Sequence, residues 1–478
     1  MTEYPRPRLL IGGRWLDGDL APAPIENPAT GEILGHCPVA SDAQIDAALA
    51  SAEDGFLGWR AVAPAQRERV LSDAADLLVQ RCEEIARILT REQGKPLAEA
   101  RSEILRGADL LRWDAAEARR GYGRVLPSAP GVRQQVIREP VGPVAAFSPW
   151  NLPVSSAIRK MGSALAAGCA VVLKAAEEAP ASVCGFVACL QEAGMPDGVV
   201  NLLFGDPPRI SERLIASPVV RAVTFTGSVP VGKQLAALAG AHMKPCVMEL
   251  GGHAPVFVCE DADPEAAARA SVAAKFRNAG QICIAPTRFY VADALHDRFV
   301  ESFAAAAREV RVGDGLDPET HMGPLAHERR LAATIELVED AESKGANVVA
   351  GGRRIGNRGH FFEPTVLTDV PEIARVLCEE PFGPIAPILR AGDLRHAIER
   401  ANALPYALAA YAFTDSVAVA DMLMENVDCG ILTINHLGGV PPEGPFGGVK
   451  DSGYGREGGA EGIGNFLTEK FVSMKVTG

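Results

Sequence analysis

Apolar residues recur at helical intervals over the first third of the chain. Leu71, Leu78 and Leu89 are spaced as they would be on one face of a helix. The segment that ends near Leu89 is followed by Gly94-Lys95-Pro96, which combines a residue that caps helix C-termini with one that breaks helices. We therefore expect residues 41–122 to be mainly helical.

After Pro140 the pattern changes to short apolar runs separated by helical stretches. The runs are four to six residues long and are bounded by turn residues. Strands that alternate with helices in this way predict βαβ units in a parallel sheet. The predicted strands are residues 143–147, 170–173, 199–204 and 222–225, and the predicted helices are residues 154–167, 182–193 and 231–238.

A second series of the same kind begins near Glu249. Because it repeats the alternation of strand and helix, we expect two α/β units, each with a doubly wound sheet. The predicted strands of the second unit are residues 254–258, 288–291, 347–349 and 430–435, and its predicted helices are residues 265–278, 295–310 and 328–344.

Two segments outside these units have the pattern of an extra β layer. Residues 121–140 are rich in Gly, Pro and Val and lack helical periodicity, and residues 466–476 alternate like a strand. Bare strand edges invite aggregation, so we expect both segments to form an arm or an added sheet between subunits.

Length and composition indicate a multidomain globular protein. The 478 residues correspond to about three domains, and 47% hydrophobic with 22% charged residues excludes disordered and coiled-coil chains. The net charge is 47 − 60 = −13 and no basic run occurs, which excludes nucleic acid and anionic membranes as partners. The uncharged stretch 140–158 contains four prolines and is no membrane span, and residues 1–14 lack a signal-peptide core, so we expect a cytoplasmic protein.

One of the ten cysteines stands out. They are scattered, with no C-x-x-C pair and no His at ligand spacing, so we expect neither a disulfide scaffold nor a metal site. Most are expected to be small buried residues. Cys283 differs because it lies in a glycine-containing loop just past a predicted helix, where a thiol is accessible to a substrate.

Glu249 and Asn151 are candidates for a base and an oxyanion donor. Glu249 follows a strand-like segment and precedes two glycines, an arrangement that can project a carboxylate into a cleft. Asn151 follows the end of a predicted strand, where open α/β sheets place ligand groups, and its amide can donate to a developing oxyanion. The alternatives are a surface Glu before a turn and an ordinary turn Asn.

Residues 225–233 favour a nucleotide site. They run from a strand through a glycine turn into a helix, whose free N–H groups suit a pyrophosphate. The Gly-x-Gly-x-x-Gly at 453–458 follows no predicted strand, and we do not interpret it as phosphate-binding. Lys174 and Glu177 follow another strand, and a carboxylate there would bind ribose hydroxyls and repel a 2′-phosphate, favouring NAD over NADP. The alternative for both segments is a solvated loop.

Together these segments resemble the NAD(P)-dependent aldehyde dehydrogenase superfamily. The resemblance begins at Ile11-Gly12-Gly13-Arg14-Trp15 and covers almost the whole chain. Its most specific elements are Glu249-Leu250-Gly251-Gly252, Asn278-Ala279-Gly280-Gln281-Ile282-Cys283, Glu380-Pro381-Phe382-Gly383-Pro384 and the stretch from Pro445 to Gly453.

The resemblance implies a domain plan and an assembly. An NAD-binding domain takes residues 1–120 and 141–248, a catalytic domain takes residues 249–440, and residues 441–464 return along the active site. An oligomerisation arm takes residues 121–140 and 465–478, so a homodimer or homotetramer is expected.

The resemblance also implies a role for each candidate residue. Cys283 is the nucleophile, Glu249 the general base and Asn151 an oxyanion donor beside the Cys283 backbone N–H. Attack on an aldehyde gives a thiohemiacetal, loss of hydride leaves a thioester, and water activated by Glu249 releases the acid. NAD is the expected cofactor, with NADP as an alternative, and the implied cofactor-binding residues are Ser148, Trp150, Lys174, Glu177, Gly227, Ser228, Gly232, Glu380 and Phe382.

Two arginines refine the expected substrate. Arg159 and Arg277 match positions at which the succinate-semialdehyde branch binds a distal carboxylate, and a guanidinium pairs with a carboxylate bidentately. With Phe446 they form the expected substrate site for succinate semialdehyde or 2-oxoglutarate semialdehyde. Pro441-Pro442 stands where some succinate-semialdehyde enzymes place a serine for the carboxylate, which weakens the case for succinate semialdehyde itself.

Two other functions remain open from the sequence. Trp150 and Phe446 would wall an apolar pocket in a broad-specificity dehydrogenase for neutral aliphatic or aromatic aldehydes, with the arginines paired to surface acids. An inactive relative kept as a binding or structural protein is the other, although the intact Cys283, Glu249 and Asn151 argue against it.

Overall fold

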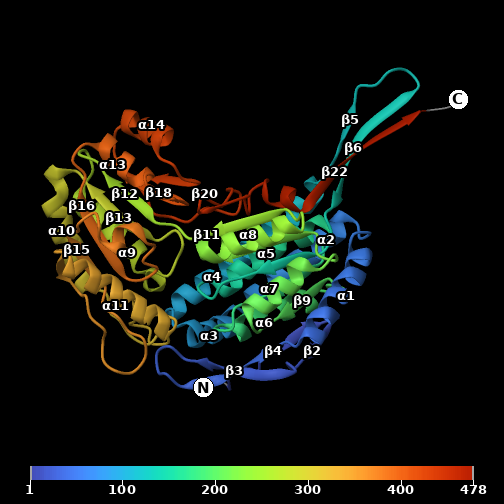
Figure 1. The fold of residues 1–478 in the computed structure, drawn as a ribbon, viewed down its shortest axis with the longest axis horizontal. Helices are drawn as coiled ribbons and strands as arrows, with labels where there is room; N and C mark the ends of the chain where they lie inside the picture. The colour runs from blue at the N-terminus through green and yellow to red at the C-terminus, as the bar shows by residue number, and fades with distance from the viewer. Residues whose placement is uncertain (1–2, 476–478) are drawn as a thin grey trace.

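The first α/β unit is built on an eight-stranded sheet with the order β2-β1-β9-β8-β7-β10-β11-β21. The computed structural model describes residues 3–475, and Figure 1 shows the sheet beneath its helices. The five central strands are parallel because helices cross over between them, whereas both edges are antiparallel. The strands are β1 (Leu9–Ile11), β2 (Arg14–Leu16), β7 (Val144–Phe147), β8 (Val171–Lys174), β9 (Val200–Leu203), β10 (Ala222–Gly227), β11 (Cys246–Leu250) and β21 (Gly453–Tyr454).

The helical region predicted before residue 122 forms four helices. The helix that contains Leu89 ends at Gln93, and Gly94 caps it with a φ of 92°, a left-handed conformation that glycine adopts without strain. The helices are α1 (Asp42–Trp59), α2 (Pro64–Gln80), α3 (Cys82–Gln93) and α4 (Leu97–Glu117), and those that follow in this unit are α5 (Pro153–Ala167), α6 (Pro180–Glu192), α7 (Pro207–Ala216) and α8 (Val229–Ala241).

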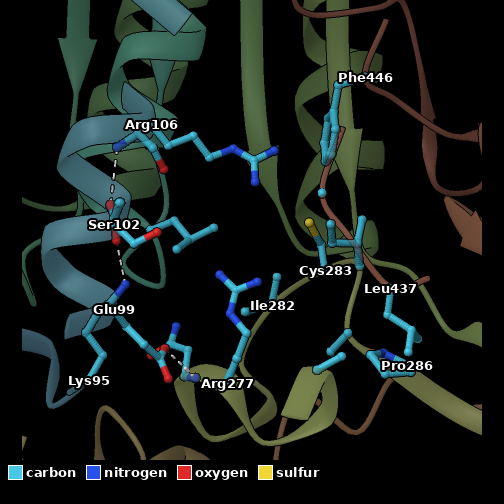
Figure 2. Close-up of a pocket in the computed structure, with 18 of the residues that line it drawn as sticks. Lys95, Glu99, Ser102, Arg106, Arg277, Ile282, Cys283, Pro286, Leu437 and Phe446 are labelled. Carbon is cyan, nitrogen blue, oxygen red and sulfur yellow. Dashed lines mark hydrogen bonds and ion pairs between the residues drawn. The ribbon is translucent and has the colours of Figure 1, made fainter. Parts of the chain in front are cut away.

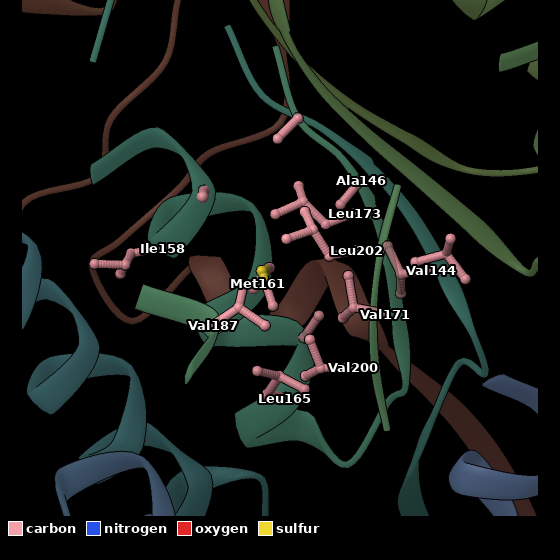
Figure 3. Close-up of a cluster of buried hydrophobic side chains, with 14 of the residues drawn as sticks. Val144, Ala146, Ile158, Met161, Leu165, Val171, Leu173, Val187, Val200 and Leu202 are labelled. Carbon is pink, nitrogen blue, oxygen red and sulfur yellow. The ribbon is translucent and has the colours of Figure 1, made fainter. Parts of the chain in front are cut away.

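Helix α5 is the most deeply buried of these helices and fixes one wall of the site. Every residue in it except Arg159 is buried. Figure 3 shows Met161 and Leu165 of this helix lying against sheet residues such as Val171. Because close packing leaves a buried helix little freedom, the loop before α5 and the Arg159 side chain are held in defined positions.

The second α/β unit has a seven-stranded sheet with the order β14-β15-β16-β13-β12-β18-β19. All neighbouring strands are parallel except the antiparallel edge pair β14 and β15. Its strands are β12 (Ala254–Val258), β13 (Pro286–Val291), β14 (Asn347–Ala350), β15 (Thr365–Thr368), β16 (Ile385–Arg390), β18 (Ala409–Phe413) and β19 (Ile431–Ile434), and its helices are α9 (Pro264–Lys275), α10 (Asp293–Arg308), α11 (Glu328–Ser343), α12 (Arg375–Cys378), α13 (Leu394–Asn402) and α14 (Val417–Asn426). The prediction of two α/β units is confirmed.

A three-stranded antiparallel sheet projects from the first unit (Figure 1). In it β6 (Val132–Pro140) lies between β5 (Arg124–Leu126) and β22 (Leu467–Lys475). The two segments expected to form an arm are therefore paired with each other, although residues 476–478 of that prediction lie outside the described residues.

The structure corrects three details of the sequence predictions. The boundary between the units falls after Leu250, because β11 carries Glu249 as part of the first sheet. The helix predicted for residues 265–278 ends at Lys275 and gives way to a 3₁₀ turn, Arg277–Gly280. A hairpin of β3 (Leu20–Glu26) and β4 (Ile33–Val39) and the strands β15, β16 and β18 were not predicted.

Two absences hold for residues 3–475. No helix in this range is both long and apolar enough to cross a membrane. Nor do three His, Cys, Asp or Glu side chains in this range come together as a metal site.

Candidate active site

The carboxyl ends of the first sheet and loops of the second unit enclose a cavity of about 630 Å³. Parallel α/β sheets bind ligands at this end of their strands. The structure brings together residues from separate predictions here: Trp150 and Asn151 after β7, Gly227 and Ser228 after β10, Glu249 in β11, Cys283, Glu380 and Phe382 in the second unit, and Phe446 in the returning segment.

A strained, tightly bonded loop holds Cys283 in this cavity. Asn278 and Ala279 have φ values of 48° and 53°, which are uncommon for residues with a side chain. Hydrogen bonds support this shape, because Gln281 Nε2 donates to the Asn278 carbonyl at 2.9 Å and Gln281 Oε1 accepts from the Ala326 N–H at 2.9 Å. Strain of this kind is concentrated at functional sites.

The Cys283 thiol is half-buried, and its surroundings shift its pKa. Burial is the first cause that raises its pKa well above the usual value, and the carboxyl groups of Glu249 and Glu380 raise it further. Arg159 and the Ile284 backbone N–H act in the opposite direction. A base must therefore take the thiol proton before the sulfur can attack.

Glu249 has the properties of a general base. Its side chain is buried on β11, and Oε1 has no hydrogen-bond partner among the described residues. Burial raises its pKa to about 8, with Glu457 as the next cause, while Lys160 and Arg159 oppose the shift. A carboxyl group that titrates near neutral pH suits proton transfer.

A buried ion pair beside Glu249 was missed by sequence reasoning. Lys160 of α5 is fully buried and pairs with Glu457, whose Oε2 has no partner in the described part of the chain. Both charges act on the pKa of Glu249. The only sequence signal is a lysine within a helix whose other residues, apart from Arg159, are small or apolar.

Asn151 is clamped in the loop between β7 and α5. Its Nδ2 donates to the Gln281 carbonyl at 3.0 Å, which leaves one of its two amide hydrogens for another acceptor. Its own carbonyl accepts from Lys95 Nζ at 2.8 Å and from Asn278 Nδ2 at 3.0 Å. Lys95 thus positions the loop that carries Asn151. From the sequence, Lys95 was considered only as part of the segment that ends a predicted helix.

Lys95 is itself fixed by a buried partner. Its Nζ lies 2.5 Å from Glu103 Oε2, and both side chains are almost wholly buried. Glu103 Oε1 accepts from the backbone N–H groups of Val154 and Ser155 at the start of α5. This pair joins α4, α5 and the Asn151 loop.

The larger cavity has the features of a dinucleotide site. Trp150 and Phe382 pack edge to face with ring centroids 5.5 Å apart, and Glu380 Oε1 accepts from the Gly252 N–H at 3.1 Å. Burial raises the pKa of Glu380 to about 7. The first turn of α8 has no side-chain cap after Ser228, so its N–H groups are available to a phosphate. These residues fit the expected nucleotide.

Four expected cofactor residues do not line this cavity. Lys174 and Glu177 form an ion pair of 2.5 Å after β8, and Glu177 Oε1 also accepts from the Gly205 N–H. Ser148 is buried, and its Oγ has no partner among the described residues. Gly232 faces Leu250, where a Cβ would collide with the leucine, so its role is helix-to-strand packing rather than lining a phosphate turn.

A smaller chamber of about 100 Å³ opens on the other side of Cys283 (Figure 2). Its lining includes Arg159, Arg277 and Phe446, as the sequence predicted, and also Arg106, which it did not. The Arg159 guanidinium lies 4.5 Å from the centroid of the Phe446 ring.

Comparisons with known proteins agree with this geometry. The aldehyde dehydrogenase family model matches residues 15–472. The chain is 50% identical to 4-(hydroxymethyl)benzenesulfonate dehydrogenase of Comamonas testosteroni, covering 98% of each, and 41% identical to mitochondrial succinate-semialdehyde dehydrogenase of Arabidopsis thaliana, covering 97% of this chain and 88% of the relative. An aldehyde dehydrogenase of Bacillus cereus, solved as an NAD⁺ complex, superposes with a TM-score of 0.97 at 32% identity, covering 99% of this chain and 98% of that one. The chain belongs to the aldehyde dehydrogenase family.

Proposed function

We propose that this enzyme oxidises a short aldehyde with an anionic group at its far end to the corresponding acid, using NAD or NADP. Carboxylated semialdehydes such as succinate semialdehyde and 2-oxoglutarate semialdehyde belong to this class. Relatives named for succinate semialdehyde, glutarate semialdehyde and benzenesulfonate compounds support an anionic substrate.

The observation that carries the proposal is the chamber at Cys283. It holds Arg159 and Arg277 together with the thiol, and neither arginine forms an ion pair with an acid of the described residues. A chain with a net charge of −13 thus places two cations that form no ion pair with the described residues at its nucleophile. A chamber of about 100 Å³ limits the substrate to a small molecule.

The residues present support a thioester mechanism. The Cys283 thiol loses its proton to solvent water, the thiolate attacks the aldehyde carbon, and Asn151 Nδ2 with the Cys283 N–H donates to the oxyanion. When bound, the nicotinamide cofactor supplies the hydride acceptor. Glu249 then removes a proton from water, which attacks the thioester carbon and restores the thiol as the acid leaves.

We further propose that NAD is preferred over NADP. The Lys174–Glu177 pair and the Gly205 N–H hold the Glu177 carboxylate at the end of β8. A carboxylate there accepts ribose hydroxyls and repels a 2′-phosphate.

We also propose that the arm pairs with a second copy of the chain, giving a homodimer or homotetramer. Both outer strands of its sheet, β5 and β22, have one side unpaired within residues 3–475. Val125 and Phe471 on these strands are 84% and 58% exposed. Exposed apolar side chains on unpaired edge strands are typical of a surface that pairs with another chain.

The test of the substrate class is steady-state NADH formation from succinate semialdehyde and from pentanal. We expect the anionic aldehyde to be favoured in kcat/KM, and Arg159→Ala/Arg277→Ala to remove that advantage by roughly 10-fold or more, the size of a lost charged hydrogen bond. Arg298→Ala on α10, which breaks an exposed pair with Glu265 on α9, serves as the matched control. If pentanal does equally well with wild type and double variant, the enzyme acts on neutral aldehydes.

A further inference from the structure

Arg106 brings a third guanidinium into the chamber from a separate part of the fold. It lies on α4, whereas Arg159 lies on α5 and Arg277 follows α9. Figure 2 shows the Arg106 and Arg277 side chains reaching into the same space, with Cys283 and Phe446 opposite Arg106. No short motif joins these three positions, so the sequence alone does not group them.

The protein compensates the guanidinium charges only at a distance, because Glu99 interacts electrostatically with Arg277, and Asp114 and Glu249 with Arg159. Within residues 3–475 none of the three guanidinium groups forms an ion pair, and the Arg106 side chain donates to the Val440 carbonyl at 2.7 Å. Arg159 Nη1 is buried and has no hydrogen-bond partner among the described residues. Burial lowers the pKa of Arg106, and the charges of Arg159 and Arg277 lower it further.

The acids in the lining do not remove this excess. Glu103 is paired with Lys95, and Glu99 accepts from the Asn278 backbone N–H. Counting Lys95, the lining carries four cations against two carboxylates. Buried cations that repel one another are costly unless an anion joins them.

We propose that Arg106 is a third specificity-determining residue, and that the three arginines form a receptor for a head group with three terminal oxygens, a sulfonate or a phosphonate. This inference rests on the proposed oxidation of an anionic aldehyde. A planar carboxylate offers two oxygens, which two guanidinium groups already satisfy. A tetrahedral sulfonate or phosphonate presents a third oxygen in a third direction, matching donors that approach from three elements of the fold.

The test uses aldehydes that differ only in the head group. The set is succinate semialdehyde, 3-oxopropane-1-sulfonate, 3-oxopropylphosphonate and the neutral butanal, and 4-formylbenzoate with 4-formylbenzenesulfonate repeats the comparison on an aromatic ring. We expect wild type to favour a three-oxygen head group over the carboxylate in kcat/KM. A preference for either the sulfonate or the phosphonate supports the receptor. The preferred head group shows which charge the receptor binds.

Variants of Arg106 separate the receptor from a general effect of charge. Arg106→Ala is expected to lower kcat/KM for the preferred three-oxygen substrate by roughly 10- to 100-fold, mainly through KM, to lower it only a few-fold for succinate semialdehyde, and to affect butanal least. Arg106→Lys keeps the positive charge but lacks the planar guanidinium with its paired N–H donors. It should therefore recover only part of the lost kcat/KM. Arg101→Ala, on the same helix but paired with Glu83 outside the chamber, is the control. Thermal unfolding followed by circular dichroism shows that each variant has folded.

Two results overturn the inference and differ from each other. If wild type favours the anions over butanal but Arg106→Ala weakens the carboxylate and the three-oxygen substrates equally, the three-oxygen receptor is wrong while the proposed function stands. If butanal matches every anion in wild type, the proposed function fails and the receptor fails with it.

Discussion

At the scale of single residues, the protonation of Glu249 sets the pH at which the enzyme can turn over. Its pKa of about 8 means that the carboxylate form, which accepts a proton, becomes more populated as pH rises through 8. We therefore expect kcat to increase with pH between about 6 and 9 when thioester hydrolysis limits turnover.

Glu249→Gln should remove this rising limb. The variant is expected to give a first burst of NADH but very slow steady turnover, because the thioester forms and then lacks a base for water. Rapid mixing with NADH absorbance separates the burst from the steady rate. An unchanged steady-state rate in Glu249→Gln, or a wild-type rate that falls between pH 6 and 9, would contradict this role.

Asn151 gives a second prediction for a single residue. Replacing one oxyanion donor costs roughly 100- to 1000-fold in kcat in other enzymes, and we expect Asn151→Ala to lose a similar factor. The exposed Asn347→Ala is the control, since its side chain bonds to Asp369 on the surface. If Asn151→Ala loses less than tenfold in kcat and its thermal stability is unchanged, the Asn151 amide holds the loop in place but does not bind the oxyanion.

Single residues were predictable where the local sequence carries the signal. Cys283, Glu249 and Asn151 each stand next to glycines or prolines at the end of an element, and the structure brings all three to one cavity. Lys160 and Arg106 were missed because their partners lie 297 and 334 positions away in the chain. Only folding brings such groups together, so no local pattern could reveal them.

At the scale of elements, the buried Lys95–Glu103 pair joins α4 to the Asn151 loop. Lys95→Met leaves the Glu103 carboxylate buried without its partner, and we expect it to lose about 3–5 kcal/mol of unfolding free energy. Adding Glu103→Gln should recover part of this loss, because the amide oxygen still accepts from the first turn of α5 without a buried charge. Activity should stay low in both variants, since the Asn151 carbonyl has lost its donor.

Urea denaturation followed by circular dichroism measures this difference. Arg298→Met, at an exposed pair, should change stability by less than about 1 kcal/mol. If Lys95→Met is no more damaging than Arg298→Met, the buried pair does not hold the loop.

Elements were predictable wherever apolar runs alternated clearly with helical stretches. The strand at Ala254–Val258 was predicted with its observed limits, and α5 was predicted to within one residue. The hairpin of β3 and β4 was missed because its residues are mostly exposed, so no face is marked by apolar side chains. The turn at Asn278 replaced the end of a predicted helix because Asn278 donates hydrogen bonds to the distant Asn151 carbonyl and Glu99 carboxylate, which stabilise its left-handed backbone.

At the scale of the whole molecule, the arm is the surface available to a second copy. We expect the wild-type protein to have a mass in solution that is a multiple of 50.4 kDa, and Val125→Asp/Phe471→Asp to shift it towards a single chain. Charges at an apolar contact cost desolvation without a partner. Light scattering after size-exclusion chromatography gives both masses, with Ile373→Asp as an exposed control far from the arm in sequence. A wild-type monomer would contradict the proposed assembly.

The account as a whole rests on an acyl group carried by Cys283 in a chamber that accepts anions. The most direct measurement is intact-protein and peptide mass spectrometry of Glu249→Gln after one turnover with NAD and succinate semialdehyde. The account predicts one succinyl group for each active chain, located on the peptide that contains Cys283, and its absence when Arg159 and Arg277 are also replaced by alanine at the same aldehyde concentration. An unmodified Cys283, or a label on another cysteine such as the exposed Cys378, would contradict it.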